Sequence, residues 1–202
     1  MANFTRIFRL ARLLLTTTVL LACVAPLAAQ ANADSLWRAW QNPALHDTLR
    51  LKALQSLTWG MLTKNPDSAF SLARREVDYG RESGYKLWEA KGLYNIATYY
   101  YGKGEYGEAM SFYQKSLDLR IEIGDLKGEG AVYGNFGVIY NQQGNNLKAL
   151  DFQLKSLELN LKLKDTAGIT TNYNNLAMIY QDQSNPAKAL AYYDEVLKLY
   201  DP

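Results

Sequence analysis

The segment LYNIATYYYGKGEYGEAMSFYQKSL, residues 93–117, decides the fold, because the chain repeats its pattern twice more at an offset of forty residues. In the first copy the recurring positions are Leu93, Ile96, Ala97, Tyr100, Gly104, Ala109, Tyr113 and Leu117. The second copy has Tyr133, Phe136, Gly137, Tyr140, Gly144, Ala149, Gln153 and Leu157. The third has Tyr173, Leu176, Ala177, Tyr180, Ser184, Ala189, Tyr193 and Leu197. Three blocks that align without a gap indicate an internal repeat.

Each copy contains two amphipathic helices. The first four recurring positions follow the spacing i, i+3, i+4, i+7, so they share one helical face, and the positions from Ala109 to Leu117 do the same for a second helix. The glycine between the two helices permits a turn with positive φ. A single pair of helices has more apolar surface than it can bury alone, and stacking successive pairs buries that surface. No segment of the sequence alternates with the period of a strand, so we predict no strand.

This pattern resembles the tetratricopeptide repeat (TPR), whose signature is W-x2-L-G-x2-Y, then A-x3-F, then P. The small residue of the signature is Ala97, Gly137 or Ala177, while Ile121 and Leu161 replace the closing proline. The unit is forty residues long against the usual thirty-four, with the surplus expected in the residues 120–127 and 160–166. The resemblance implies an all-α fold, a right-handed α-solenoid of antiparallel helix pairs.

The array is expected to occupy residues 46–202, with a degenerate repeat over 46–85 and clear repeats over 86–125, 126–165 and 166–202. Asp47 and Thr48 are predicted to cap a helix over residues 49–62, and residues 30–45 form a linker or cap helix. The clear repeats predict helices near 86–102, 105–122, 127–143, 146–163, 167–182 and 186–200.

Residues 1–29 have the features of a secretory leader. Arg6, Arg9 and Arg12 form a positive end, an apolar run follows, and small residues permit cleavage after Ala29 or Ala31. An alternative is that Leu20-Leu21-Ala22-Cys23, which resembles a bacterial lipobox, directs lipidation of Cys23. The first interpretation predicts an exported protein, periplasmic or extracellular, with no cysteine and no membrane span after the leader is removed.

The charge balance excludes several kinds of partner. The whole chain has a formal charge of +2, but three of its 22 basic residues lie in the leader, which has no acidic residue, so 19 basic residues face 20 acidic ones elsewhere. No basic run favours nucleic acid or an anionic membrane. The 15 tyrosines suit helix packing and peptide-binding grooves.

The sequence offers no catalytic constellation. His46 is the single histidine and is interpreted as a surface residue at a helix start. There is no Cys/His cluster for a metal, no glycine-rich phosphate loop and no nucleophile elbow, so we expect neither enzyme activity nor a cofactor.

A groove is the better candidate site, because in TPR proteins the first helices of the repeats line a concave face that binds peptides. By position, this resemblance implies that the ligand-groove candidates are Lys91, Tyr94, Asn95, Thr98, Tyr101, Asn135, Val138, Asn141, Asn174, Asn175, Met178 and Gln181. Asn95, Asn135 and Asn175 recur at one place, where they either hold a peptide backbone or bond a neighbouring helix. Lys91 has no lysine at the equivalent positions, which argues against a clamp for a peptide carboxylate.

These observations predict an exported scaffold that binds a protein or peptide segment. The forty-residue units also resemble the arrays at the front of bacterial signalling proteins. The alternative is therefore the input region of a membrane-anchored histidine kinase, nucleotide cyclase or DNA-binding protein, which a hydrophobic span after Pro202 would favour. The last helix is predicted to expose an apolar flank, through which the chain could self-associate.

Overall fold

The computed structural model describes residues 32–200, which are helical apart from short turns and contain no strand. The leader predicted over residues 1–29 lies outside this part of the chain. The described residues divide into two units, with the boundary between Leu57 and Thr58.

In the first unit, a helix over residues 32–41 is followed by α2 (Asp47–Met61), which continues into the second unit. α2 begins two residues before the predicted start at Leu49, so the prediction that Asp47 and Thr48 form its cap is wrong. The backbone N–H of Thr48 instead donates to Nδ1 of His46, at 3.3 Å. The imidazole therefore takes the place of the capping side chain.

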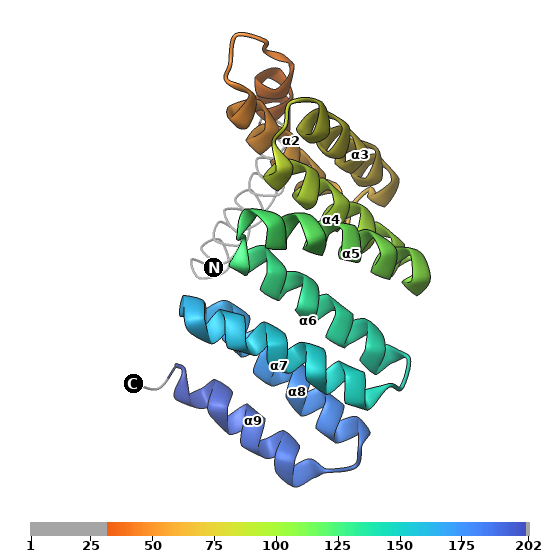
Figure 1. Ribbon diagram of the computed structural model, residues 1–202, viewed down its shortest axis with the longest axis vertical. Coiled ribbons are helices and arrows are strands. Elements are labelled where there is room, and N and C mark those ends of the chain that lie inside the picture. Colours follow the sequence, from red (N-terminus) through yellow and green to blue (C-terminus); the bar gives the residue numbers. More distant parts are fainter. Residues whose placement is uncertain (1–31, 201–202) are drawn as a thin grey trace, which may run out of the picture. The chain divides into compact units, whose positions relative to one another are not determined.

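The second unit is a stack of antiparallel helices (Figure 1). Its helices after α2 are α3 (Pro66–Glu82), α4 (Lys86–Gly102), α5 (Tyr106–Ile123), α6 (Leu126–Gln142), α7 (Asn146–Leu163), α8 (Thr166–Asp182) and α9 (Pro186–Lys198). From α3 on, each helix packs against the next in the chain, and α6 also contacts α8. The six helices predicted for the clear repeats are present, and each begins within one residue of its predicted start.

The turns follow the forty-residue repeat. Gly104 and Gly144 lie between the helices of a pair and have φ of 76° and 72°, which confirms the positive φ expected of them. Between successive pairs, Gly124 and Lys164 are left-handed, and the aspartate after each accepts from a backbone N–H of the following helix. These turns end one helix and begin the next.

Repeated apolar positions on the first helices and repeated alanines on the second helices lie in the core of the second unit. Ile96, Phe136 and Leu176 are buried, and so are Ala109, Ala149 and Ala189 on the facing helices. Gly137 shows why small residues recur here, because a Cβ on it would lie 2.6 Å from Nε2 of Gln153. Side chains of this size let the two helix axes approach closely.

An aromatic pair recurs in every clear repeat. Tyr100, Tyr140 and Tyr180 of the first helices stack on Phe112, Phe152 and Tyr192 of the second helices. The ring centroids are 5.5, 5.4 and 5.7 Å apart, and the ring planes are within 11° of parallel. Near-identical stacks imply that the two helices of each pair meet at the same angle and distance.

The last helix, α9, and the residues that follow it expose apolar side chains. Leu190, Leu197 and Tyr200 are each more than 60% exposed, in agreement with the apolar flank predicted for the last helix, whereas Tyr193 and Val196 on the same helix are half-buried.

A buried carboxyl group lies between α2, α3 and α4. Glu76 is fully buried, and it accepts hydrogen bonds from Oγ1 of Thr58 and, at 3.1 Å, from Nδ2 of Asn95. Burial raises the pKa of Glu76 to about 7, although the two hydrogen bonds oppose that rise. The folded protein therefore holds a proton on Glu76 at pH values where the unfolded chain has released it.

This difference predicts a stability that falls with rising pH. The contribution of Glu76 is fully present below its ordinary pKa of 4.5 and is lost as the pH rises through about 7. The slope from this group approaches about 1.4 kcal/mol per pH unit between those values. Urea unfolding followed by circular dichroism from pH 5 to pH 8 should show this slope.

Glu76→Gln keeps a neutral hydrogen-bonding group in place and should remove that part of the slope. Glu82→Gln, which changes an exposed carboxylate on the same helix, should leave the pH slope of the stability unchanged. Equal slopes in the Glu76→Gln variant and the parent chain would show that the raised pKa of Glu76 is not the source of the slope.

Candidate functional site

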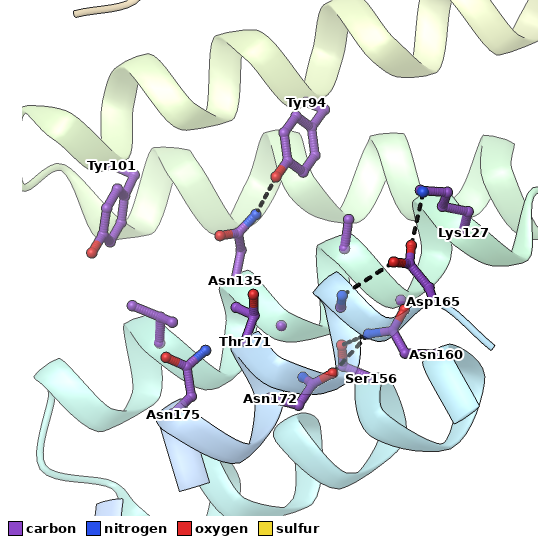
Figure 2. A pocket seen from close by; sticks show the side chains of 15 residues that line it. Tyr94, Tyr101, Lys127, Asn135, Ser156, Asn160, Asp165, Thr171, Asn172 and Asn175 are labelled. Atoms are coloured by element: carbon purple, nitrogen blue, oxygen red, sulfur yellow. Dashed lines mark hydrogen bonds and ion pairs between the residues drawn. The ribbon is translucent and has the colours of Figure 1, made fainter. Parts of the chain in front are cut away.

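Two adjoining cavities lie along the first helices of the clear repeats, α4, α6 and α8, with part of their lining from α7. The larger holds about 480 Å³, and its side chains are shown in Figure 2. It is lined by Tyr94, Tyr101, Lys127, Gly130, Ala131, Gly134, Asn135, Val138, Ser156, Asn160, Asp165, Gly168, Thr171, Asn172 and Asn175. The smaller holds about 70 Å³ and shares Val138 and Asn175 with the larger. We refer to the two cavities together as the groove.

Seven of the twelve groove candidates line it. Five of them line the larger cavity: Tyr94, Tyr101, Asn135, Val138 and Asn175. The smaller cavity adds Asn141 and Met178. The structure thus brings together side chains that are forty residues apart in the sequence.

The other five candidates lie outside both cavities. Lys91 lies over the ring of Trp88, Thr98 donates to the backbone oxygen of Tyr94, and Gln181 accepts a hydrogen bond from Tyr193. Asn174 is half-buried and lines neither cavity.

Asn95 is the clearest departure from the predicted asparagine ladder. It is 2% exposed, and its amide donates to the buried carboxyl group of Glu76. Asn95 therefore cannot serve as one of three equivalent ligand contacts. At this position the alternative prediction, a hydrogen bond to a neighbouring helix, is confirmed. Asn135 and Asn175 are half-buried and remain at the groove.

Hydrogen bonds connect the first helices of consecutive repeats along the groove. Nδ2 of Asn135 donates to Oη of Tyr94 at 2.8 Å, as Figure 2 shows, and Nε2 of Gln142 donates to Oη of Tyr101 at 2.8 Å. Nδ2 of Asn141 donates to Asp182 at 2.9 Å. Every one of these three bonds joins residues 41 apart, so each ties a first helix to the next one.

A buried amide network underlies the larger cavity. Nδ2 of Asn160 donates to Oδ1 of Asn172 at 2.7 Å, and Nδ2 of Asn172 donates to Oε1 of Gln153 at 2.9 Å. Gln153 in turn donates to the backbone oxygen of Gly134 at 2.9 Å. Sequence reasoning missed this network, because it used first-helix positions and Gln153 and Asn160 belong to the second helix α7.

The rim of the larger cavity carries a neutralised pair of charges. Nζ of Lys127 lies 2.7 Å from Oδ2 of Asp165, which also caps α8 through the backbone N–H of Gly168. The hydrogen bond from Lys127 holds the pKa of Asp165 below its usual value. The pair adds no net charge to the cavity.

The same space one repeat earlier is filled by Arg120. Its guanidinium is 5.4 Å from the ring centroid of Tyr94, and Nη1 lies 2.7 Å from Oδ2 of Asp125. Burial lowers the pKa of Arg120, but the neighbouring carboxylate of Asp125 opposes this effect. In the next repeat Gly134 replaces Tyr94 and Asn160 replaces Arg120. The cavity opens because two large side chains have become small.

The described residues offer neither a cluster of metal ligands nor a membrane span. No group of three or more His, Cys, Asp or Glu side chains that could hold a metal ion occurs within residues 32–200. None of the helices there is long and apolar enough to cross a bilayer.

Sequence comparison identifies the family. Two profiles of the tetratricopeptide repeat match residues 90–123 and 128–201, which together are more than half of the chain. The chain belongs to the tetratricopeptide repeat family. TPR proteins are generally not enzymes, and their arrays are scaffolds for protein–protein interaction. No curated protein matches this TPR chain by sequence.

Solved structures with the same fold are distant in sequence. BtubC from P. vanneervenii is 19% identical with a TM-score of 0.66, over 86% of this chain and 72% of BtubC. RapI in its apo form is 19% identical with a TM-score of 0.68, over 79% of this chain and 58% of RapI. A Podosopora anserina protein assigned as a kinesin light chain, with nearly identical TPR-like repeats, is 13% identical with a TM-score of 0.56, over 85% of this chain and 94% of that protein. They support a TPR-like solenoid.

The contact between Arg120 and Gly128 can be tested by a double-mutant cycle. A Cβ on Gly128 would lie 1.4 Å from Nη1 of Arg120, so Gly128→Ala must displace a buried guanidinium from Asp125. We expect Gly128→Ala to lower the free energy of unfolding by about 2–4 kcal/mol in the parent chain. A Cβ on Gly128 would also lie 2.2 Å from Oδ2 of Asp125, so in the Arg120→Ala background the cost of Gly128→Ala should fall by at least about 1 kcal/mol and should not vanish. Urea unfolding of the four proteins measures the coupling.

Gly107→Ala is the matched control, because a Cβ there would enter open space. It should stabilise the protein by up to about 1 kcal/mol. Additive effects of Gly128→Ala and Arg120→Ala would show that the arginine does not occupy this space.

Proposed function

We propose that this TPR protein is exported and that it binds an extended segment of a partner protein in the groove. The observation that carries the proposal is that the two cavities adjoin at Val138 and Asn175, on first helices of successive repeats. A peptide lying across α6 and α8 would contact both cavities. The volume of the larger one falls within the range of natural ligand sites.

The chemistry of the groove suits a peptide backbone. Asn135 uses its Nδ2 to bond Tyr94, and its Oδ1 has no partner among the described residues. Within the same part of the chain, Asn175 makes no hydrogen bond with either amide atom, and Oδ1 of Asn141 is buried without a partner. A peptide supplies both N–H donors and C=O acceptors to such side chains.

Export is supported by the leader at residues 1–29. Its positive end, apolar run and small residues are the three parts of a signal peptide.

Photo-crosslinking tests the binding surface. Benzoylphenylalanine placed at Ala131 or Thr171, two exposed residues that line the larger cavity, should crosslink to a polypeptide in the native host. The same group at Leu147, which is 83% exposed and lines neither cavity, should give no such product. Mass spectrometry of the crosslinked band identifies the partner.

Val138→Lys places a charge where the two cavities adjoin and should abolish the crosslinks from Ala131 and Thr171. Leu147→Lys is the matched control and should leave them unchanged. Crosslinks that persist in the Val138→Lys variant would place the partner on another surface.

Processing of the leader tests export separately. The mature chain should begin at Gln30 or Asn32, as read by intact mass, and should appear outside the cytoplasm of the native host. Cys23→Ser should leave the processing unchanged. A mature chain that begins with a lipidated Cys23 would replace this assignment with the lipobox alternative.

A further inference from the structure

The larger cavity differs from the smaller one in its volume, about 480 Å³ against about 70 Å³, and in the two buried asparagines that line it. Asn160 and Asn172 lie at its base and are 7% and 2% exposed. Gly130, Gly134 and Gly168 contribute backbone to its wall and no side chain. The cavity can therefore admit a whole side chain of a ligand.

Two residue differences between successive repeats determine where along the array this cavity lies. Tyr94 and Arg120 fill the equivalent space of the preceding repeat, where Gly134 and Asn160 leave it open. A ligand that fills the cavity is consequently held in one register along α4, α6 and α8.

Apart from the paired Lys127 and Asp165, the side-chain hydrogen-bonding groups that line the cavity are uncharged and include both donors and acceptors. Oδ1 of Asn135 and Oδ1 of Asn160 are acceptors with no partner in the described part of the chain. The hydroxyl of Tyr94 accepts a bond from Asn135 and keeps its own proton for donation, while Asn175 offers a donor and an acceptor. These groups require a ligand that both donates and accepts, because a buried polar atom left unpaired is costly.

Charged ligand groups find no counter-charge there. The carboxylate of Asp165 is paired with Lys127, and the carboxylate of Asp125 is paired with Arg120. A ligand ammonium or carboxylate would lose its hydration without gaining an ion pair, whereas a carboxamide loses much less.

From these observations we infer that the larger cavity is a specificity pocket for an uncharged carboxamide side chain, glutamine or asparagine, of the bound segment. The inference rests on the proposed peptide-binding function and adds the side-chain class that it selects. The carboxamide donates to Oδ1 of Asn135 and Asn160 and accepts from Tyr94, while the neighbouring backbone of the peptide lies along Asn175.

The test uses four pools of blocked peptides of about twelve residues, which span roughly 40 Å when extended. The pools share randomised flanks and carry Gln, Glu, Lys or Leu at one central position. Fluorescence anisotropy with the purified chain measures the affinity of each pool. The Gln pool should bind at least about tenfold more tightly than the other three, a difference of about 1.4 kcal/mol.

Gly134→Tyr restores the aromatic residue of the preceding repeat and should reduce the preference for Gln to less than about twofold. A Cβ at residue 134 would lie 3.4 Å from Oγ of Ser156, so the backbone can accept a side chain there. Gly107→Tyr is the matched control, because residue 107 faces open space outside the groove. It should leave the preference intact.

Asn175→Leu is a second variant that does not fill the cavity. It removes an amide that makes no hydrogen bond within residues 32–200, so the fold does not depend on that amide. It should weaken binding of the Gln pool by about tenfold. Circular dichroism confirms that each variant is folded before binding is measured.

The outcomes separate this inference from the proposed function. Equal binding of all four pools, or a preference for Gln that survives Gly134→Tyr, would overturn the carboxamide pocket and leave peptide binding in the groove standing. Preference for Glu, Lys or Leu would overturn the pocket in the same way. Failure of every pool to bind, together with absent crosslinks from Ala131 and Thr171, would overturn both.

Discussion

The stack of Tyr100, Tyr140 and Tyr180 on a ring of the partner helix sets the geometry of the three clear repeats. Because the stacks have nearly the same centroid distance and ring angle, each helix pair repeats the one before it. The small residues beside the stacks, Ala97 and Gly137 among them, keep the helices close enough for the rings to meet. Because the geometry of the helix pairs is constant, residues forty positions apart occupy equivalent places and can be compared directly.

Because the helix pairs repeat in this way, the larger cavity depends on the side chains that differ between repeats. Arg120 and Asn160 occupy equivalent positions and face Gly128 and Gly168, yet Arg120 pairs with Asp125 while Asp165 pairs with the exposed Lys127. The longer side chain closes its space and the shorter one leaves a cavity above an amide network. The fold accommodates both side chains because the guanidinium of Arg120 and Nδ2 of Asn160 are each hydrogen-bonded, which is how buried polar groups are stabilised in a core.

The sequence predicted the parts of the structure that depend on local pattern. The helix starts of the clear repeats, the left-handed glycines Gly104 and Gly144 and buried anchors such as Ile96 follow from short-range spacing. Asn95 could not be placed in the same way, because its partner Glu76 lies in the degenerate repeat, outside the forty-residue register. The amides of α7 and α8 at the base of the cavity were missed for a similar reason. Their partners are set by packing between helices, which no single-helix pattern records.

The bonds that connect successive first helices also determine which atoms remain for a ligand. Asn135 and Asn141 each direct Nδ2 to a neighbouring repeat, so each amide is held in place with its oxygen unpaired. An oxygen held in this way is an acceptor whose position is fixed before a ligand arrives, and binding then orders little of the protein. The residues that hold the array together therefore also prepare its surface for N–H donors. Under the proposed peptide-binding function, oxygens held in this way suit the backbone and amide N–H groups of a peptide better than its charged groups.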